Sequence, residues 1–345
     1  MINLYGLAPQ PLETMMLSMG QKKFRAIQLY TWLYEKKARS FEEMSDVSLR
    51  FREELAATFT LDLPSIATQQ IASDGTIKLL LEMADGAKVE TVLMRYDYGN
   101  ALCVSSQVGC NMGCAFCASG LLRKQRNLEV HELIGQYMVM QQLLGPDDRI
   151  SHVVVMGTGE PFDNYENLMD FIRILNHPKA LAIGARHITV STCGLVDRIR
   201  QYAHEGIQIN LAISLHAPND DLRSKLMRIN QAYPLDSLLE AVKYYEVHSG
   251  RRVTFEYIML RDVNDLPEHA HQLADRIKGI QSYVNLIPYN EVGEVPFRRS
   301  GRERVRQFCD LLKQRGVNCT IRKEFGVDID AACGQLRAKK EGVIR

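Results

Sequence analysis

The apolar and polar positions of the chain fall into three successive patterns. Near the start, apolar side chains recur every three or four positions in residues 12–19, 24–37 and 46–59. That spacing is typical of amphipathic helices. In residues 77–81 and 89–94 the composition is instead β-type, and turn sequences flank both runs. We therefore expect a small helical domain followed by a short β-hairpin.

From residue 101 onward, apolar runs of strand length alternate with longer amphipathic segments. The predicted strands are residues 102–105, 153–156, 188–191, 209–214, 253–258, 283–288 and 318–322. The predicted helices between them include residues 131–144, 165–175, 235–248, 267–280 and 302–315. This alternation indicates an α/β fold with a parallel sheet, and the number of units favours a partial, TIM-like (β/α)6 barrel over a complete barrel. A doubly wound sheet is the alternative, and either fold places its chemistry at the carboxyl ends of the strands.

Composition narrows the class of protein only a little. The chain has 345 residues, of which 46% are hydrophobic and 24% charged, and its net charge is +1. These values are ordinary for a globular protein, so any binding of nucleic acid has to come from local basic clusters. We expect no signal peptide and no membrane association, because no apolar run is long enough to span a bilayer. In a cytoplasmic protein of this kind, eight cysteines indicate a metal or redox role rather than disulfides.

The strongest chemical signal is a cysteine triplet directly after the first strand of the repeating region. Cys110, Cys114 and Cys117 form a CxxxCxxC motif. Three thiolates this close favour an iron–sulfur cluster that leaves one iron open for a ligand. A zinc site would need a fourth ligand, for which His131 or Cys103 is nearest. A zinc-stabilised, non-catalytic RNA-binding module is therefore the alternative function, although such a module would not need the long series of strands and helices.

Five further segments place the triplet within one family. They are CVSSQVGC at 103–110, MGTGEP at 156–161, ISLHAPN at 213–219, NLIPYN at 285–290 and DIDAACGQL at 328–336. Together they resemble the RlmN/Cfr family of adenosine methyltransferases, a branch of the radical S-adenosylmethionine (SAM) superfamily. The resemblance runs nearly from end to end, from Phe24 to Lys340.

This resemblance implies a [4Fe–4S] cluster held by Cys110, Cys114 and Cys117, with SAM as the second cofactor. The residues that it implies around SAM are Gly159, Glu160, Ser191, Ser214, Leu215, His216 and Asn290. The chemistry suits Gly159 and Glu160, because glycine lets the backbone approach a ligand and a carboxylate pairs with an ammonium group. Taken alone, each of the polar residues is more typical of a turn or a cap.

The resemblance also implies two further cysteines and a carboxylate in the reaction, which uses two SAM molecules per turnover. One SAM methylates Cys333, and a 5′-deoxyadenosyl radical from the second SAM removes hydrogen from that methyl group. The carbon radical then adds to C2 of an adenine, Glu90 accepts a proton, and Cys103 releases the product by forming a disulfide with Cys333. From local sequence alone, Cys333 is better explained as a small buried cysteine, Cys103 is compatible with a core residue of a strand, and Glu90 is more typical of a solvent-facing strand residue.

The implied substrate is an adenosine of 23S rRNA in the peptidyl-transferase region, with an adenosine beside the tRNA anticodon as a second target. An electron donor such as flavodoxin feeds the cluster in this family, and we expect a monomer. Phe325 and Gly326 resemble the branch that methylates C8 and confers antibiotic resistance. Residues 159–163 and 184–187 resemble the branch that methylates C2, which we favour.

These assignments divide the chain into four parts. They are a helical RNA-binding domain at 1–65, a β-hairpin connector at 66–100, the partial barrel at 101–325, and a catalytic loop and tail with Cys333 at 326–345. Basic clusters offer contacts for RNA phosphates. They are Lys22, Lys23 and Arg25; Lys36, Lys37 and Arg39; Arg123, Lys124 and Arg126; Arg298, Arg299, Arg302 and Arg304; and Arg337, Lys339 and Lys340. The third cluster adjoins the cysteine triplet, so we expect it at the rim of the active site.

Overall fold

A mixed sheet of ten strands runs through the part of the chain that the computed structural model describes, residues 1–145, 147–293, 295–329, 335–340 and 342–343. Its strand order is β14-β13-β12-β11-β10-β9-β6-β5-β4-β3. The strands are β3 (Ser65–Ile71), β4 (Ile77–Glu82), β5 (Lys88–Tyr96), β6 (Gly99–Cys103), β9 (Ile150–Val155), β10 (Ile188–Thr192), β11 (Asn210–Ser214), β12 (Val253–Met259), β13 (Ser282–Pro288) and β14 (Asn318–Ile321). Neighbours are parallel from β6 to β14 and antiparallel from β3 to β6.

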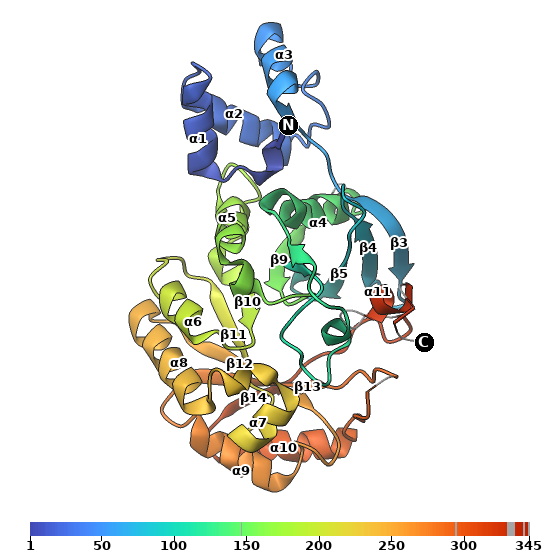
Figure 1. The fold of residues 1–345 in the computed structure, drawn as a ribbon, viewed down its shortest axis with the longest axis vertical. Helices are drawn as coiled ribbons and strands as arrows, with labels where there is room; N and C mark the ends of the chain where they lie inside the picture. The colour runs from blue at the N-terminus through green and yellow to red at the C-terminus, as the bar shows by residue number, and fades with distance from the viewer. Residues whose placement is uncertain (146, 294, 330–334, 341, 344–345) are drawn as a thin grey trace.

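The parallel part of the sheet is a partial barrel, as predicted. Helical crossovers join successive parallel strands in the described residues. They contain α4 (Val130–Gln142), α5 (Tyr165–Asn176), α6 (Val196–Tyr202), α7 (Asp220–Leu226), α8 (Leu235–Ser249), α9 (Pro267–Arg276) and α10 (Arg302–Gln314). Figure 1 shows these helices along the outer side of the curved sheet. The sheet stays open because β14 and β3 stand at its opposite edges.

The strands of the barrel are apolar because both of their faces are covered. In β12, for example, Val253, Phe255 and Tyr257 are fully buried on one face, and on the other face Glu256 is buried and Thr254 and Ile258 are half-buried. Strands that are buried on both sides read as continuous apolar runs, which is why the sequence predicts them well. The sequence analysis did not predict α6 and α7. Each has seven residues, which is too short for an apolar period to stand out.

The N-terminal segment forms the helices α1 (Pro9–Ser18), α2 (Phe24–Tyr30) and α3 (Leu49–Thr58), and a π-helical turn (Thr31–Glu35) prolongs α2. The two-residue strands β1 (Ile2–Asn3) and β2 (Phe59–Thr60) pair in parallel and close this unit. Figure 1 shows it at one end of the molecule, above α4 and α5. Its apolar side chains belong to the same core cluster as those of the barrel.

The predicted β-hairpin extension continues the barrel sheet. It has three antiparallel strands, β3, β4 and β5, and β5 pairs with β6 at Val92↔Cys103. The C-terminal helix α11 (Gln335–Lys340) packs against β5 and against the 3-10 helix η3 (Ala118–Leu121), which directly follows the cysteine triplet. Within the described ranges, no helix combines the length and the apolar character needed to cross a lipid bilayer.

Candidate functional site

A cavity of about 190 Å³ opens at the carboxyl ends of the parallel strands. The predicted residues that line it are Cys110, Cys114, Cys117, Gly159, Glu160, Ser191, Ser214 and His216. They come from β10 and β11 and from the loops that follow β6, β9 and β11. The carboxyl ends of parallel strands meet at one edge of a sheet, and this brings residues from distant parts of the sequence together.

The cysteine triplet lies on a loop that two backbone hydrogen bonds hold in place. Cys110 N donates to Leu122 O over 2.9 Å. Ala115 N donates to Leu226 O over 2.9 Å. Burial raises the pKa of the Cys110 thiol to about 11 and also raises the pKa of Cys114, and neighbouring thiols add to both shifts. A bound metal group would lower both values, because its positive charge stabilises thiolates.

Three thiols on the wall of one cavity suit an iron–sulfur cluster better than a zinc ion. In such a cluster each thiolate binds its own iron, so the three sulfur atoms do not have to meet at one point. In a zinc site, four ligands surround a single ion. Among the residues that the structure describes, no three histidine, cysteine, aspartate or glutamate side chains converge on a position suited to one metal ion.

Glu160 presents to this cavity a carboxylate that two backbone amides hold. Its Oε1 accepts a hydrogen bond from Phe162 N (3.0 Å), and its Oε2 accepts one from Cys193 N (2.7 Å). The side chain is buried, and burial raises its pKa above the ordinary value of 4.5. No lysine, arginine or histidine of the described segments forms an ion pair with it. A buried carboxylate of this kind suits a ligand that carries an ammonium group.

The backbone next to Glu160 requires glycine. Gly159 has a φ of +114°, and a Cβ there would lie 2.6 Å from Ser106 Oγ and 2.7 Å from Gln107 Cβ. Gln107 Oε1 in turn accepts a hydrogen bond from Glu160 N (2.9 Å). The strand-end loop is therefore packed tightly against the loop that leads to the cysteines, with its backbone free of side-chain cover on the cavity side.

His216 is held as a neutral imidazole on the cavity wall. Its Nδ1 accepts a hydrogen bond from Ile258 N (3.1 Å), and its ring meets Phe116 edge-on with 5.0 Å between centroids. Burial, together with the nearby Arg223 guanidinium, lowers the pKa of His216 to about 3. The φ of +59° at His216 is unusual for a residue with a side chain, and such backbone positions occur often at ligand sites.

Two of the residues predicted around SAM lie outside this cavity. Leu215 is buried in the main core, where its N–H donates to Glu256 O (3.0 Å). Asn290 lines a second cavity, of about 500 Å³. The two cavities adjoin, because Phe116, Cys117, Ile287 and Arg322 line both of them. The roles of Leu215 and Asn290 toward SAM remain predictions.

Glu90 and Cys103 are buried together near the second cavity. Cys103 packs in a small cluster with Val92 and Met94, which line that cavity, and with Phe325. Glu90, Val92 and Met94 alternate along β5, so their side chains share one face of the sheet. Glu90 does not face solvent, since its exposed fraction is 4%. Its Oε2 lies 2.8 Å from Lys78 Nζ, and its Oε1 accepts a hydrogen bond from Arg337 N over 2.6 Å.

Cys333 lies outside the described residues, whereas its neighbour Gln335 does not. Gln335 begins α11 and lines the second cavity together with Cys117. Its Nε2 donates to Glu291 O over 3.0 Å. Gln335, two residues after Cys333, therefore lies on the wall of the cavity that adjoins the cysteine triplet.

Sequence reasoning missed three ionic residues around the site, of which Glu256 and Lys78 are buried and Arg322 is half-buried. Glu256 and Arg322 line the first cavity, and burial raises the pKa of the Glu256 carboxyl. Lys78 is fully buried against Glu90. Glu256 and Lys78, like Glu90, each interrupt an otherwise apolar strand, so a search for charged residues within apolar strands could have found them. Arg322 carries no comparable signal, because it follows the last strand in a polar segment.

Comparison with known families defines the class of protein. The family described as "Radical SAM superfamily" matches residues 104–276, which contain the cysteine triplet and the Glu160 loop. The family described as "Ribosomal RNA large subunit methyltransferase N-terminal domain" matches residues 2–61. A crystal structure of a radical SAM methyltransferase from Sphaerobacter thermophilus superimposes with a TM-score of 0.92. It is 41% identical, with 97% of this chain and 99% of that chain covered.

Named relatives then specify the family. Proteins called "Probable dual-specificity RNA methyltransferase RlmN" from Streptococcus thermophilus and Enterococcus faecalis are both 54% identical to this chain. The matches cover 97% and 98% of this chain, and 88% and 96% of the relatives. A protein of the same name from Spiroplasma citri is 51% identical, with 100% of both chains covered. The chain belongs to the RlmN family of radical SAM methyltransferases, and this family membership implies a [4Fe–4S] cluster and SAM.

Proposed function

We propose that this chain methylates C2 of an adenosine in 23S rRNA and in tRNA, with Cys333 as the carrier of the methyl group. One observation above all supports this reaction. The cavity of the cysteine triplet and Glu160 adjoins a second cavity whose wall includes Gln335, two residues beyond Cys333. A radical formed in the first cavity would therefore arise beside the cavity that Gln335 lines, two residues along the chain from the methyl carrier.

Cys110, Cys114 and Cys117 would hold the cluster, and Glu160 would bind the ammonium group of SAM. When bound, the reduced cluster supplies the electron that splits SAM into methionine and a 5′-deoxyadenosyl radical. Gly159, Ser191, Ser214 and His216 line the same cavity and would contact the remaining polar groups of SAM. Two SAM molecules are used per turnover, because one is consumed as the methyl donor and the other as the source of the radical.

Three protein residues act in turn on the methyl group and on the adenine to which it is attached. Cys333 loses a hydrogen atom from its S-methyl group to the radical, and the resulting carbon radical adds to the adenine ring. The radical adduct then transfers one electron to the oxidised form of the electron donor. After that, Glu90 accepts the proton from the modified ring carbon. Cys103 then attacks the sulfur of Cys333, the carbon–sulfur bond breaks with its electron pair on carbon, and that carbon takes up a proton. The disulfide between Cys103 and Cys333 is reduced again before the next turnover.

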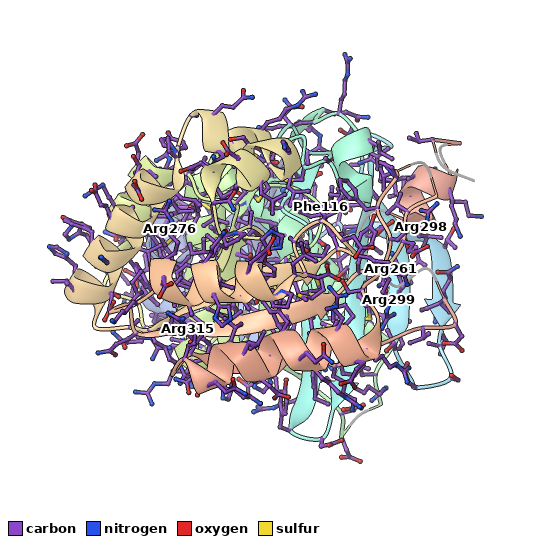
Figure 2. All side chains as sticks on the ribbon, turned by 90° about the horizontal axis from the view of Figure 1, so that it is seen from below. Phe116, Arg261, Arg276, Arg298, Arg299 and Arg315 are labelled. Atoms are coloured by element: carbon purple, nitrogen blue, oxygen red, sulfur yellow. The ribbon has the colours of Figure 1, made fainter. Side chains whose placement is uncertain are left out.

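The second cavity is the place proposed for the adenine, and exposed cations at its rim would contact RNA phosphates. Figure 2 shows Arg261, Arg298 and Arg299 on the same side of the molecule as Phe116, with Arg276 and Arg315 on the other side. Arg298 and Lys323 are exposed. An adenine has to leave its stack to reach a recessed cavity, and arginine and lysine side chains then hold the flanking backbone.

Two side chains of the basic cluster that we favoured for RNA binding, Arg123, Lys124 and Arg126, already form ion pairs within the protein. Lys124 Nζ lies 2.6 Å from Asp163 Oδ2. Arg126 contacts both Asp85 and Glu132 at 2.7 Å. Arg123 of this cluster is exposed, so it joins Arg298 and Lys323 as a candidate for phosphate contacts. Residues 1–65 would add a further surface that binds RNA. The enzyme would act as a monomer, and a flavodoxin-type electron donor would reduce its iron–sulfur cluster.

The experiment that tests the proposal is mass spectrometry of 23S rRNA and tRNA from cells with and without the gene. Loss of 2-methyladenosine from both RNAs on deletion, with recovery on complementation, is the expected result. Loss of 8-methyladenosine instead would show that Phe325 and Gly326 mark the C8 branch. Unchanged RNA, or a colourless zinc protein after anaerobic reconstitution, would exclude the radical methyltransferase.

A further inference from the structure

The buried ion pair between Lys78 and Glu90 has no counterpart elsewhere among the described residues. Lys78 Nζ lies 2.8 Å from Glu90 Oε2, and the side chains are 0% and 4% exposed. The other ion pairs in these ranges each have at least one partner with a larger exposed fraction. Two charges removed from water need close and well-aligned contact to be stable, so a pair this deeply buried fixes both side chains.

Strand register places this pair beside the proposed resolving cysteine. Lys78 pairs with Val92 across β4 and β5, and Val92 pairs with Cys103 across β5 and β6. Directly opposed residues of antiparallel strands point to the same face, so Lys78, Val92 and Cys103 form one row on that face. Glu90 is two positions from Val92 along β5 and therefore shares the face.

The two oxygens of Glu90 are turned toward different partners. Oε2 contacts Lys78, whereas Oε1 accepts a hydrogen bond from Arg337 N (2.6 Å), in the helix that follows Cys333. The backbone of the same residue accepts a hydrogen bond from Ser105 Oγ (2.6 Å), and Ser105 Oγ accepts one from Thr158 N (3.0 Å) in the loop of Gly159. Glu90 is thus linked to both the methyl-carrier segment and the SAM loop.

We propose that Lys78 is a positioning residue for the proton transfer, in that its contact with Oε2 fixes the Glu90 carboxylate and turns Oε1 toward Arg337, four residues after Cys333. The inference rests on the proposed function. The proton leaves the modified ring carbon of the tethered adenine and bonds to Oε1, and the C–H electron pair returns to the aromatic ring. Each carboxylate oxygen has two acceptor positions, so Oε1 can take the proton while it still accepts Arg337 N. Lys78 keeps its own protons throughout.

A purely structural ion pair would behave differently from a positioning pair. If Lys78 only stabilises the sheet, its removal lowers the amount of folded protein and affects every step of the reaction alike. If Lys78 orients Glu90 for proton transfer, its removal slows only the steps after the adenine has been attached to Cys333. The covalent RNA–protein adduct then accumulates, and a structural role does not produce that signature.

The test uses the full chain with its cluster reconstituted under anaerobic conditions, and follows the adduct by denaturing gel and mass spectrometry. The variants are Glu90→Gln, Lys78→Met and Lys78→Arg. Lys88→Met is the matched control, because Lys88 forms a 3.2 Å ion pair with Glu82 across the same two strands but is 39% exposed. Adduct yield is divided by iron content, so that each value refers to folded, cluster-bearing protein.

We expect Glu90→Gln to slow adduct breakdown by about 100-fold and Lys78→Met by about tenfold or more, in the range of general base catalysis. Adduct formation should stay within about twofold of the original chain in both, because the radical steps do not need a base. Lys78→Arg keeps the charge and should restore most of the breakdown rate, and Lys88→Met should match the original chain. If Lys78→Met does not fold, Lys78→Gln replaces it. It removes the charge but its amide can still donate to Glu90, so adduct breakdown should slow by less than in Lys78→Met and by more than in Lys78→Arg.

Each other result has one meaning. If Glu90→Gln accumulates adduct but the neutral Lys78 variants do not, the role of Lys78 is wrong and the proposed function stands. If Lys78→Met lowers iron content and turnover in equal proportion without adduct, the pair is structural. Rapid adduct breakdown in Glu90→Gln would remove Glu90 as proton acceptor, and the inference on Lys78 with it.

Discussion

The two sides of the site each contain a buried carboxylate, and they differ in where the compensating charge comes from. Glu160, in the loop after β9, accepts hydrogen bonds from two backbone amides, and burial raises the pKa of its carboxyl. Glu90, on β5, contacts the ammonium group of Lys78 at 2.8 Å. The first side has no protein cation for its carboxylate among the described residues, whereas the second side supplies its own.

This difference separates a ligand-binding carboxylate from one that works within the protein. A buried anion without a partner is unfavourable, so a fold retains it only where something else brings the opposite charge. At Glu160, under the proposed function, the ammonium group of SAM would bring that charge with the ligand. At Glu90 the cation belongs to the protein, so the carboxylate is paired and oriented before any substrate binds. We therefore expect that removing the charge of Lys78 and removing the charge of Glu160 change the free energy of unfolding in different directions.

The largest effect is expected on the Glu90 side, from Cys103→Ala. Without the thiol, the adduct between Cys333 and adenine is not resolved, so turnover stops after one event. Multiple-turnover methylation should fall by about 1,000-fold or more, the scale seen when a covalent catalyst is removed. A stable RNA–protein adduct should appear on denaturing gels. Binding of SAM should be unchanged, because Cys103 does not line the SAM cavity.

Normal turnover by Cys103→Ala would exclude the two-cysteine reaction for this chain. Cys309→Ala is a suitable control, because Cys309 is also a buried thiol but lies on α10, in the core away from both cavities. It should methylate at the original rate and leave no adduct.

The next effect is on folding stability, where the two sides should respond in opposite directions. Lys78→Met leaves Glu90 as a buried charge without its cation and should lower the free energy of unfolding by about 3–5 kcal/mol. Glu160→Gln removes a buried charge while it keeps the shape of the side chain, so the free energy of unfolding should stay the same or rise slightly. Chemical denaturation of the cluster-bearing protein without SAM measures both. Equal losses in the two variants would contradict the distinction.

Much of this comparison could be predicted from sequence, and the remainder depends on contacts between distant residues. The cysteine triplet and the Glu160 loop are local motifs, and the apolar period places both at strand ends. Glu90 was found only through family resemblance, because a single acidic residue in a strand does not reveal which face it occupies. Its partner Lys78 comes from the neighbouring strand, and only the antiparallel register of β4 and β5 brings the two together.

The same limit applies to the β-hairpin extension predicted at residues 66–100. The turns at its ends are visible in the sequence, whereas its edge-to-edge pairing with the barrel is not. The pairing of β5 with β6 makes it the wall that carries Glu90. The basic cluster at Lys124 and Arg126 was assigned to RNA for a similar reason, since its partners Asp85, Glu132 and Asp163 are not apparent from local charge.

A smaller effect than the stability changes concerns binding of SAM to Glu160→Gln. The variant loses a charge-assisted contact worth about 2–3 kcal/mol, so the affinity for SAM should fall by about 30- to 150-fold. Equilibrium dialysis with the anaerobic, cluster-bearing protein measures the change. Glu90→Gln is the matched control and should bind SAM with the original affinity. Weaker binding in both variants would mean that the two carboxylates act on the same ligand.

The smallest effect follows from the protonation of Glu160. Burial raises the pKa of its carboxyl above 4.5, so the folded protein binds more protons than the unfolded chain between 4.5 and the raised value. The contribution of Glu160 to stability is therefore fully present below pH 4.5 and decreases as the pH rises through that window, by at most about 1.4 kcal/mol per pH unit. Glu160→Gln cannot titrate, so its stability curve should lie increasingly above that of the original chain as the pH rises. Saturating SAM should reduce the difference, because the ammonium group then compensates the carboxylate. Parallel curves without SAM would mean that Glu160 already has a cationic partner, and the contrast with Glu90 would be lost.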